Sequence, residues 1–157
     1  MKLSRLTLNV SLVTVLVAGA DVSMRGQWTP KTGEWPTYGA DLASTRYSPL
    51  DQINASNFNK LQLAFRFRTD SLGPRQEFNF QATPLMVNNT LYFTAGTRRT
   101  AVALHATTGE MLWMHKAKEG KRGEVAPRLL SGRGVAFWSD GKGDDRIIYV
   151  TPGYVMY

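Results

Sequence analysis

Hydrophobic and polar residues alternate with a period of two in the stretch 62–68. Leu63, Phe65 and Phe67 occupy one set of positions, and glutamine, alanine and arginine occupy the other. A strand with one buried face produces this period, because successive side chains point to opposite faces of a sheet. The pattern therefore predicts a half-buried β-strand in this stretch.

Four short apolar runs follow, and each is ended by residues that favour turns. The runs lie at 84–87, 91–94, 101–104 and 111–114. The segments between them are rich in Asn, Gly and Thr, which supply turn conformations and turn hydrogen bonds. Short runs joined by tight turns predict four antiparallel strands that are neighbours in one sheet.

A further pair of strands is predicted at 135–138 and 147–151, on either side of the polar loop 139–145. The aspartates of this loop superficially resemble a calcium-binding loop. A calcium loop needs oxygen ligands at regular positions and a final glutamate, and here lysine and threonine stand at two of those positions. We therefore interpret the segment as a polar hairpin loop.

Helical patterning is confined to one predicted turn at 54–60, where Asn54 or Ser56 is the candidate N-cap. The fold class is therefore all-β. Four short strands per unit suit a β-propeller blade better than a sandwich. At about 40–45 residues per blade, the 137 residues from 21 to 157 hold three blades at most, and propellers have at least four. We expect a partial β-propeller that further sequence, copies of the chain or a partner would complete.

The first twenty residues have the layout of a secretory signal peptide. Basic residues open the segment, residues 6–18 are mostly apolar, and small residues precede a cleavage point after Ala20. A membrane anchor is the alternative, but the apolar run is too short to cross a bilayer. We expect a cleaved signal peptide at 1–20, a propeller part at 21–157, and export to the periplasm.

Composition excludes several classes of function. The chain has no cysteine, which excludes disulfide scaffolds, zinc ribbons and thiol nucleophiles, and its two histidines are too few for a histidine-built metal site. Lys and Arg number 19 against 12 Asp and Glu, giving a net charge of +7. The basic residues are scattered and do not line one helix, so we interpret them as a solvated surface and expect no nucleic-acid partner.

The segment 103–113, ALHATTGEMLW, resembles the tryptophan-docking repeat of quinoprotein propellers, which has the form A-x-D-x-x-T-G-x-x-x-W. Gly109 permits a tight turn, and Thr108 can bond the backbone groups of that turn. Trp113 is expected to pack between adjacent blades. His105 replaces the usual aspartate, so one acceptor that stabilises the turn is altered.

Three further regions are similar to the N-terminal part of dehydrogenases that depend on pyrroloquinoline quinone (PQQ). They are WPTYGAD with TRYSPLDQIN at 35–54, QATPLMV at 81–87 and SGRGVAFW at 131–138. Their order and separation also match those of the family. The resemblance runs from about residue 34 to residue 153. The chain is therefore identified as a member of the glucose or alcohol dehydrogenase-like quinoproteins.

This resemblance implies a periplasmic, eight-bladed propeller that holds PQQ together with a calcium ion. Such enzymes oxidise an aldose or an alcohol and pass electrons to ubiquinone or to a cytochrome c. The chain would be the N-terminal portion, and the missing blades would come from the rest of the protein or from another chain. The catalytic aspartate and the calcium ligands belong to those blades, so we expect no catalytic residue and no metal ligand here.

The resemblance assigns two cofactor-binding residues. Arg133 matches the arginine that contacts the quinone oxygens, where a guanidinium would stabilise the negative charge that develops as hydride arrives. Gln81 stands where family members usually carry a glutamate that hydrogen-bonds the cofactor. The alternatives are a surface loop arginine and a buried strand residue, respectively. Pro127 and Arg128 occupy the positions of two adjacent cysteines of methanol-type members, which favours the glucose-dehydrogenase-like branch or a related subfamily.

Two other interpretations remain open. A non-catalytic PQQ-repeat scaffold would carry a lipid-attachment cysteine and would not need the motif around Arg133, so this cysteine-free chain favours the dehydrogenase. An inactive, truncated gene product is the other interpretation. We expect the chain by itself to lack catalysis and to aggregate or fold poorly, because it supplies one wall of a pocket and its blade faces have no neighbours.

Overall fold

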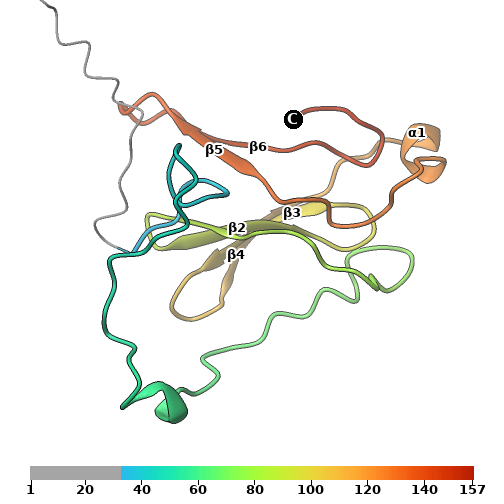
Figure 1. Ribbon diagram of the computed structural model, residues 1–157. Coiled ribbons are helices and arrows are strands. Elements are labelled where there is room, and N and C mark those ends of the chain that lie inside the picture. The colour runs from blue at the N-terminus through green and yellow to red at the C-terminus, as the bar shows by residue number, and fades with distance from the viewer. Residues whose placement is uncertain (1–32) are drawn as a thin grey trace, which may run out of the picture.

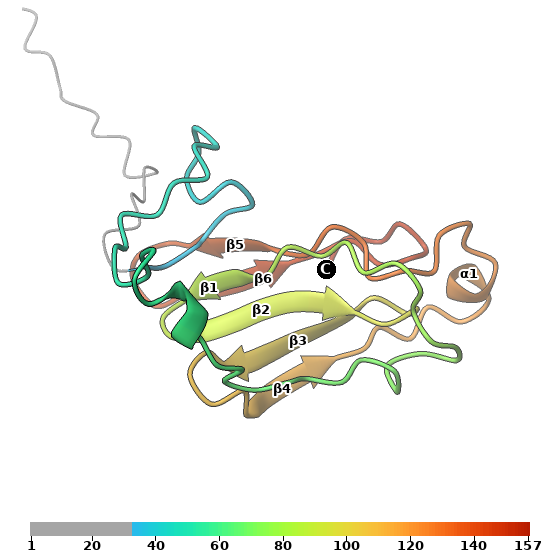
Figure 2. The ribbon, with the colours of Figure 1, turned by 60° about the horizontal axis from the view of Figure 1, so that its bottom comes forward.

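The structure, a computed structural model, describes residues 33–157 (Figure 1). The predicted signal peptide at 1–20, and the beginning of the predicted propeller part, lie outside the described residues. Within residues 33–157, no helix has the length and apolar character needed to cross a membrane. The described part of the chain forms two antiparallel sheets, which lie one above the other (Figures 1 and 2).

Four strands form the larger sheet in the order β1-β2-β3-β4, and each pairs antiparallel with its neighbour in sequence (Figure 2). The strands are β1 (Leu85–Val87), β2 (Thr90–Ala95), β3 (Thr100–His105) and β4 (Met111–His115). Each predicted apolar run is a strand of this sheet. The prediction of a four-stranded antiparallel unit is therefore confirmed.

The connection between β1 and β2 consists of Asn88 and Asn89 alone, because Val87 pairs directly with Thr90. Both asparagines have positive φ, at 50° and 57°. Positive φ at both central residues defines the type I′ turn, whose twist matches that of the flanking strands. Asparagine tolerates this left-handed conformation better than most residues do, so this pair determines the register of the hairpin.

Both faces of the larger sheet are partly buried: Leu85, Val87, Ala101 and Ala103 are buried on one face, and a core cluster lies on the other. The cluster consists of Leu72, Phe93, Ala95, Val102 and Leu104. β3 is an inner strand and is buried along nearly all of its length, whereas β4 is at the edge and is exposed at every residue. The sheet is therefore covered near β2 and β3 and open along β4.

The prediction of a strand at 62–68 is wrong. The segment forms no ladder with any residue of the described chain. Phe65 and Phe67 are half-buried and pack against the core cluster, while Leu63 is 74% exposed. The alternation arises because every second side chain faces the core, but a strand also needs a neighbouring backbone with which to pair.

The helical turn at 54–60 is only partly as predicted. It contains η1 (Phe58–Lys60), a single 3-10 turn that has no side-chain cap. Asn54 instead accepts hydrogen bonds from the backbone and the hydroxyl of Ser56, at 2.9 and 2.6 Å. The two N-cap candidates therefore stabilise the preceding turn. A second helical turn, α1 (Lys121–Glu124), has no signal in the hydrophobic pattern.

The turn between β3 and β4 shows how His105 replaces the usual aspartate. The Nδ1 atom of His105 lies 3.3 Å from the backbone nitrogen of Thr108 and 3.2 Å from its hydroxyl oxygen. The Nδ1 atom of the imidazole therefore accepts the hydrogen bond from the turn backbone that the usual aspartate would accept. Gly109 has a φ of 73°, as a tight turn requires. Trp113 lines a cavity of about 460 Å³ together with Phe137 of the second sheet, so it faces the neighbouring unit as expected.

The second sheet contains β5 (Ala136–Ser139) and β6 (Asp145–Ile148). This confirms the predicted pair, although the second strand ends before residue 151. The chain then turns back on itself: Tyr149 and Tyr157 exchange two backbone hydrogen bonds, of 2.9 and 3.0 Å. The described residues therefore comprise one four-stranded unit and the beginning of a second unit.

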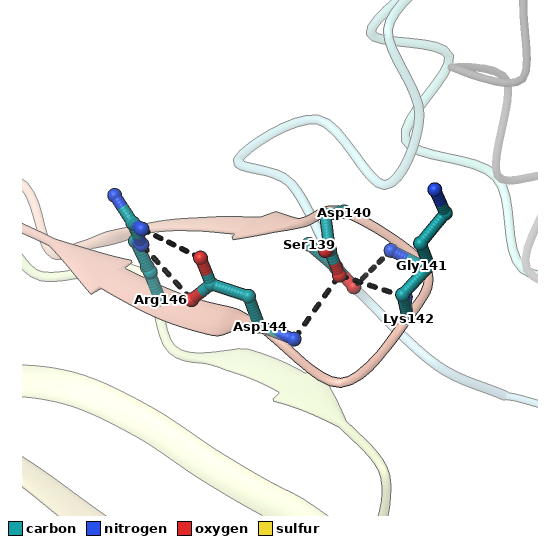
Figure 3. A network of polar contacts seen from close by, with 6 residues as sticks. All are labelled: Ser139, Asp140, Gly141, Lys142, Asp144 and Arg146. Carbon is teal, nitrogen blue, oxygen red and sulfur yellow. Dashed lines mark hydrogen bonds and ion pairs between the residues drawn. The ribbon is translucent and has the colours of Figure 1, made fainter.

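The loop between β5 and β6 satisfies its own polar groups (Figure 3). One carboxylate oxygen of Asp140 accepts hydrogen bonds from the backbone of Lys142 at 2.7 Å and of Asp144 at 3.0 Å. Asp144 pairs with Arg146, with 2.5 Å between oxygen and nitrogen. These contacts confirm the interpretation as a polar hairpin loop.

Candidate cofactor site

The two sheets meet where the segments 81–87 and 131–138 run side by side. Thr83 and Gly134 form a parallel bridge, and the backbone nitrogen of Thr83 donates to the carbonyl of Arg133 at 3.3 Å. Gly134 has a φ of +108°, and a Cβ at this position would lie 2.8 Å from the carbonyl oxygen of Thr83. Glycine is therefore required for the close approach that brings the two segments together.

Ser131 fixes the start of the loop that carries Arg133. Its side chain is fully buried, and its backbone nitrogen donates to the Glu77 carboxylate at 2.6 Å. Its hydroxyl oxygen accepts a hydrogen bond from the backbone nitrogen of Gln81 at 3.4 Å. Although they lie 50 positions apart in sequence, Ser131 and Gln81 are thus in direct contact.

Arg99 is part of this site, and the prediction that its charge belongs to a solvated surface is wrong. The side chain is half-buried, and its Nε atom donates to the carbonyl of Leu130 at 3.1 Å. Its Nη1 atom donates to the carbonyls of Val150 at 2.9 Å and Thr151 at 3.2 Å. Burial lowers the pKa of the Arg99 guanidinium, and neighbouring Tyr154 and Glu119 act in the opposite direction. Arginine remains protonated despite such shifts, so a positive charge lies here.

A second cavity of about 460 Å³, separate from the one at Trp113, is lined by the Arg133 loop, by Gln81 and by the segment that follows β6. Gln81, Arg99, Arg128 and Arg133 line it, together with the aromatic ring of Tyr154 and apolar residues of the second sheet. No aspartate or glutamate is among its lining residues. The cavity is therefore cationic, and it is suited to a ligand that carries several negative or strongly polar oxygens.

The structure brings both predicted site residues to the same cavity. Arg133 and Gln81 are exposed there, and Gln81 precedes β1, so its alternative interpretation as a buried strand residue is wrong. Their assignment to cofactor binding stays a prediction. Within residues 33–157, no three acidic or histidine side chains come close enough together to hold a metal ion.

Comparison with known proteins shows the family of the chain. The profile of the glucose/ethanol/alcohol dehydrogenase β-propeller domain matches residues 35–157, which is most of the chain. The chain belongs to this family. Its four-stranded sheet is accordingly a propeller blade, and the β5–β6 sheet is part of the next one.

Named relatives include both alcohol and glucose dehydrogenases. The chain is 37% identical to the dehydrogenase subunit of alcohol dehydrogenase (quinone) from Gluconobacter oxydans (strain 621H), over 74% of this chain and 15% of that protein. It is 36% identical to the quinoprotein glucose dehydrogenase of the same organism, over 66% of this chain and 13% of that protein. These similar identities do not favour one substrate class over the other.

The fold is also similar to that of a solved relative. The crystal structure of quinohemoprotein alcohol dehydrogenase from Comamonas testosteroni matches with a TM-score of 0.59 and 31% identity, covering 80% of this chain and 18% of that one. The chain thus spans less than a fifth of the length of this propeller enzyme. Its described residues correspond to one part of a quinoprotein propeller.

Sequence reasoning missed Arg99 and Glu77. Neither belongs to a quoted family motif, and each acts on backbone groups that lie far from it in sequence. The only local signal is the position of Arg99 directly after the β2 strand and its turn. That position alone does not distinguish an anchoring arginine from a solvated one.

Proposed function

We propose that this chain forms one wall of a PQQ site in a dehydrogenase that oxidises an alcohol or an aldose at a CH-OH group. The observation that carries the proposal is the cavity on which Arg133 and Gln81 converge together with Arg99 and Arg128. Membership of the glucose/ethanol/alcohol dehydrogenase family supports the same class of reaction.

PQQ fits the chemistry of the cavity lining. It is a planar quinone that carries carboxylates, so its site must offer cations and hydrogen-bonding groups. When bound, PQQ supplies the two-electron acceptor for the CH-OH group. Arg133 would hold a quinone oxygen and stabilise negative charge on it, and the Gln81 amide would offer one acceptor and a donor. A volume of about 460 Å³ lies within the range of small-molecule sites.

Further parts of the proposal concern sequence outside this cavity. A calcium ion would be held by residues of other blades. Electrons would pass to ubiquinone or a cytochrome c, as the names of a quinone-type and a quinohemoprotein relative suggest. Residues 1–20 would direct the protein to the periplasm. The presence of Pro127 and Arg128, where methanol-type members have cysteines, favours an aldose or a larger alcohol over methanol.

The test uses the product of the complete gene, titrated with PQQ in the presence of calcium and followed by calorimetry. Dye reduction with ethanol and with glucose then reports the reaction. R133Q should raise the dissociation constant of PQQ by about tenfold to a hundredfold, since hydrogen bonds to charged groups contribute this much.

R98Q is the matched control, because Arg98 is an exposed arginine of the same loop as Arg99 and does not line this cavity. It should bind PQQ as the unaltered protein does. Absence of PQQ binding to the unaltered protein, or unchanged binding by R133Q, would overturn the proposal. The first outcome would favour a non-catalytic propeller or an inactive gene product.

A further inference from the structure

The loop that carries Arg133 is held by two charged side chains from other parts of the chain. The Nε atom of Arg99 donates to the carbonyl of Leu130 at 3.1 Å. The carboxylate of Glu77 accepts from the backbone nitrogen of the next residue, Ser131, at 2.6 Å. These two contacts fix consecutive backbone groups directly before Gly132 and Arg133.

Arg99 connects this loop to the segment that follows β6. While its Nε atom binds Leu130, its Nη1 atom binds the carbonyls of Val150 and Thr151, at 2.9 and 3.2 Å. Because the guanidinium is planar and rigid, it sets the separation between the loop and the segment that follows β6. Lysine has a single donor nitrogen and cannot reproduce this geometry.

Arg99 and Glu77 are themselves anchored to the turn between β2 and β3. The backbone nitrogen of Arg99 donates to the carbonyl of Gly96 at 3.1 Å. The backbone nitrogen of Gly96 donates to the second carboxylate oxygen of Glu77 at 3.0 Å. One turn of the larger sheet therefore supports both side chains.

Gly132 leaves room for this arrangement. It has a φ of +75°, and a Cβ there would lie 2.7 Å from the Nε atom of Arg99. The guanidinium therefore lies directly against the backbone of the loop. Within residues 33–157, the ion pairs are Arg68–Asp70 and Asp144–Arg146. The charges of Arg99 and Glu77 accordingly act on backbone groups.

We propose that Arg99 and Glu77 are positioning residues, which together hold the loop so that the Arg133 guanidinium faces the cavity. The inference rests on the proposed function, because the ligand that Arg133 would receive is PQQ. A positioning residue affects PQQ affinity through the placement of Arg133, whereas a purely structural residue affects only the stability of the fold. This difference can be measured.

The experiment compares R99Q, R99K and E77Q in the product of the complete gene, with R98Q as the matched control. Deuterium uptake is followed in peptides that contain Thr83 and Ser131, whose backbone nitrogens hold the loop. PQQ affinity is measured by calorimetry well below the unfolding temperature. We expect faster exchange and about tenfold weaker PQQ binding in all three variants, with no change in R98Q.

E77Q tests the acceptor side of the arrangement. Glutamine has one carbonyl oxygen and places an amino group against either Gly96 or Ser131, whose nitrogens are both donors. R99K keeps the positive charge but loses the planar guanidinium, whose Nε and Nη1 atoms donate in two directions. Binding of PQQ by R99K as tight as in the unaltered protein would show that only charge matters, and would overturn the positioning role.

The double variant R99Q/R133Q decides whether Arg99 acts through Arg133. If it does, R99Q adds no further loss of PQQ affinity once Arg133 is absent. Additive losses would mean that Arg99 acts on the ligand by itself, and would overturn the inference. Unchanged deuterium uptake in R99Q would also overturn it.

The exchange measurement needs no ligand, so the two proposals fail in different ways. If the unaltered protein does not bind PQQ, the proposed function fails. The effect of Arg99 and Glu77 on the loop is still decided by deuterium uptake in that case. If PQQ binds and R99Q affects neither uptake nor affinity, only the positioning role is lost.

Discussion

Gly134 and Thr83 meet at the point where the Arg133 loop passes the start of β1. The motif SGRG singles out Arg133 through its resemblance to the family, and the structure gives the physical reason for the glycine that follows it. Arg99 could not be found in this way, because its acceptors Leu130 and Val150 lie 31 and 51 positions away in sequence. Contacts of this kind depend on the path of the backbone and leave no local pattern.

G134A is expected to destabilise the fold, because its Cβ would collide with the carbonyl of Thr83 in addition to requiring a positive φ. G141A is the control, since Gly141 also has positive φ but has nothing within 4 Å of the added carbon. The free energy of unfolding, measured with urea, should fall by about 1–3 kcal/mol more in G134A than in G141A. Equal losses would show that the close approach to Thr83 is not required.

The strands of the larger sheet were predictable because each is a short apolar run that ends in strong turn residues. The stretch 62–68 shows the limit of this reasoning. Its alternation is that of a strand, and Phe65 and Phe67 do face the core, yet no ladder forms. A period of two reports that one face is buried, whereas a strand also depends on a neighbour that periodicity does not reveal.

The β4 strand is an exposed apolar edge, and such edges promote association between chains. L112K should slow the aggregation of the isolated chain, measured by light scattering on heating, because a charged edge residue opposes edge-to-edge pairing. L63K adds the same charge at an exposed leucine outside any strand. If L63K slows aggregation as much as L112K, general charge is responsible and the β4 edge is not.

The β5–β6 hairpin should show a pH dependence that originates in one ion pair. The hydrogen bonds from Arg146 hold the pKa of Asp144 below its ordinary value. Since the folded pKa is the lower one, this contribution to stability is present above the ordinary pKa and disappears as the pH falls through the lowered value. In an NMR titration of the carboxyl carbons, R146Q should raise the pKa of Asp144. R98Q should leave it unchanged, and no rise in R146Q would contradict the assigned cause.

At the scale of the whole molecule, the described residues form one blade and part of another, and large apolar side chains remain exposed on both. Trp113 on β4 is 39% exposed and Trp138 on β5 is 45% exposed. The propeller class could be inferred from strand spacing and the docking motif. The relation between the two sheets could not, because it depends on the Thr83–Gly134 bridge and on Arg99.

The isolated 157-residue chain should therefore bind the dye ANS strongly and self-associate. Exposed apolar faces bind the dye and each other, and a repeat unit is stabilised by its neighbours. Dye fluorescence and size-exclusion chromatography with light scattering provide the measurement, with the product of the complete gene for comparison. A soluble monomer with little dye binding and a sharp cooperative melt would contradict this expectation.

The backbone pairing between Tyr149 and Tyr157 has a consequence for how a blade would grow. Val150 also pairs with Met156, so the last described residues already run antiparallel to the segment that follows β6. A residue added after Tyr157 would lie opposite Ile148, the end of β6. Such a residue would extend a ladder that has already formed, so its pairing would not require the closure of a new loop. The hairpin is thus a template on which a third strand could assemble during synthesis, residue by residue.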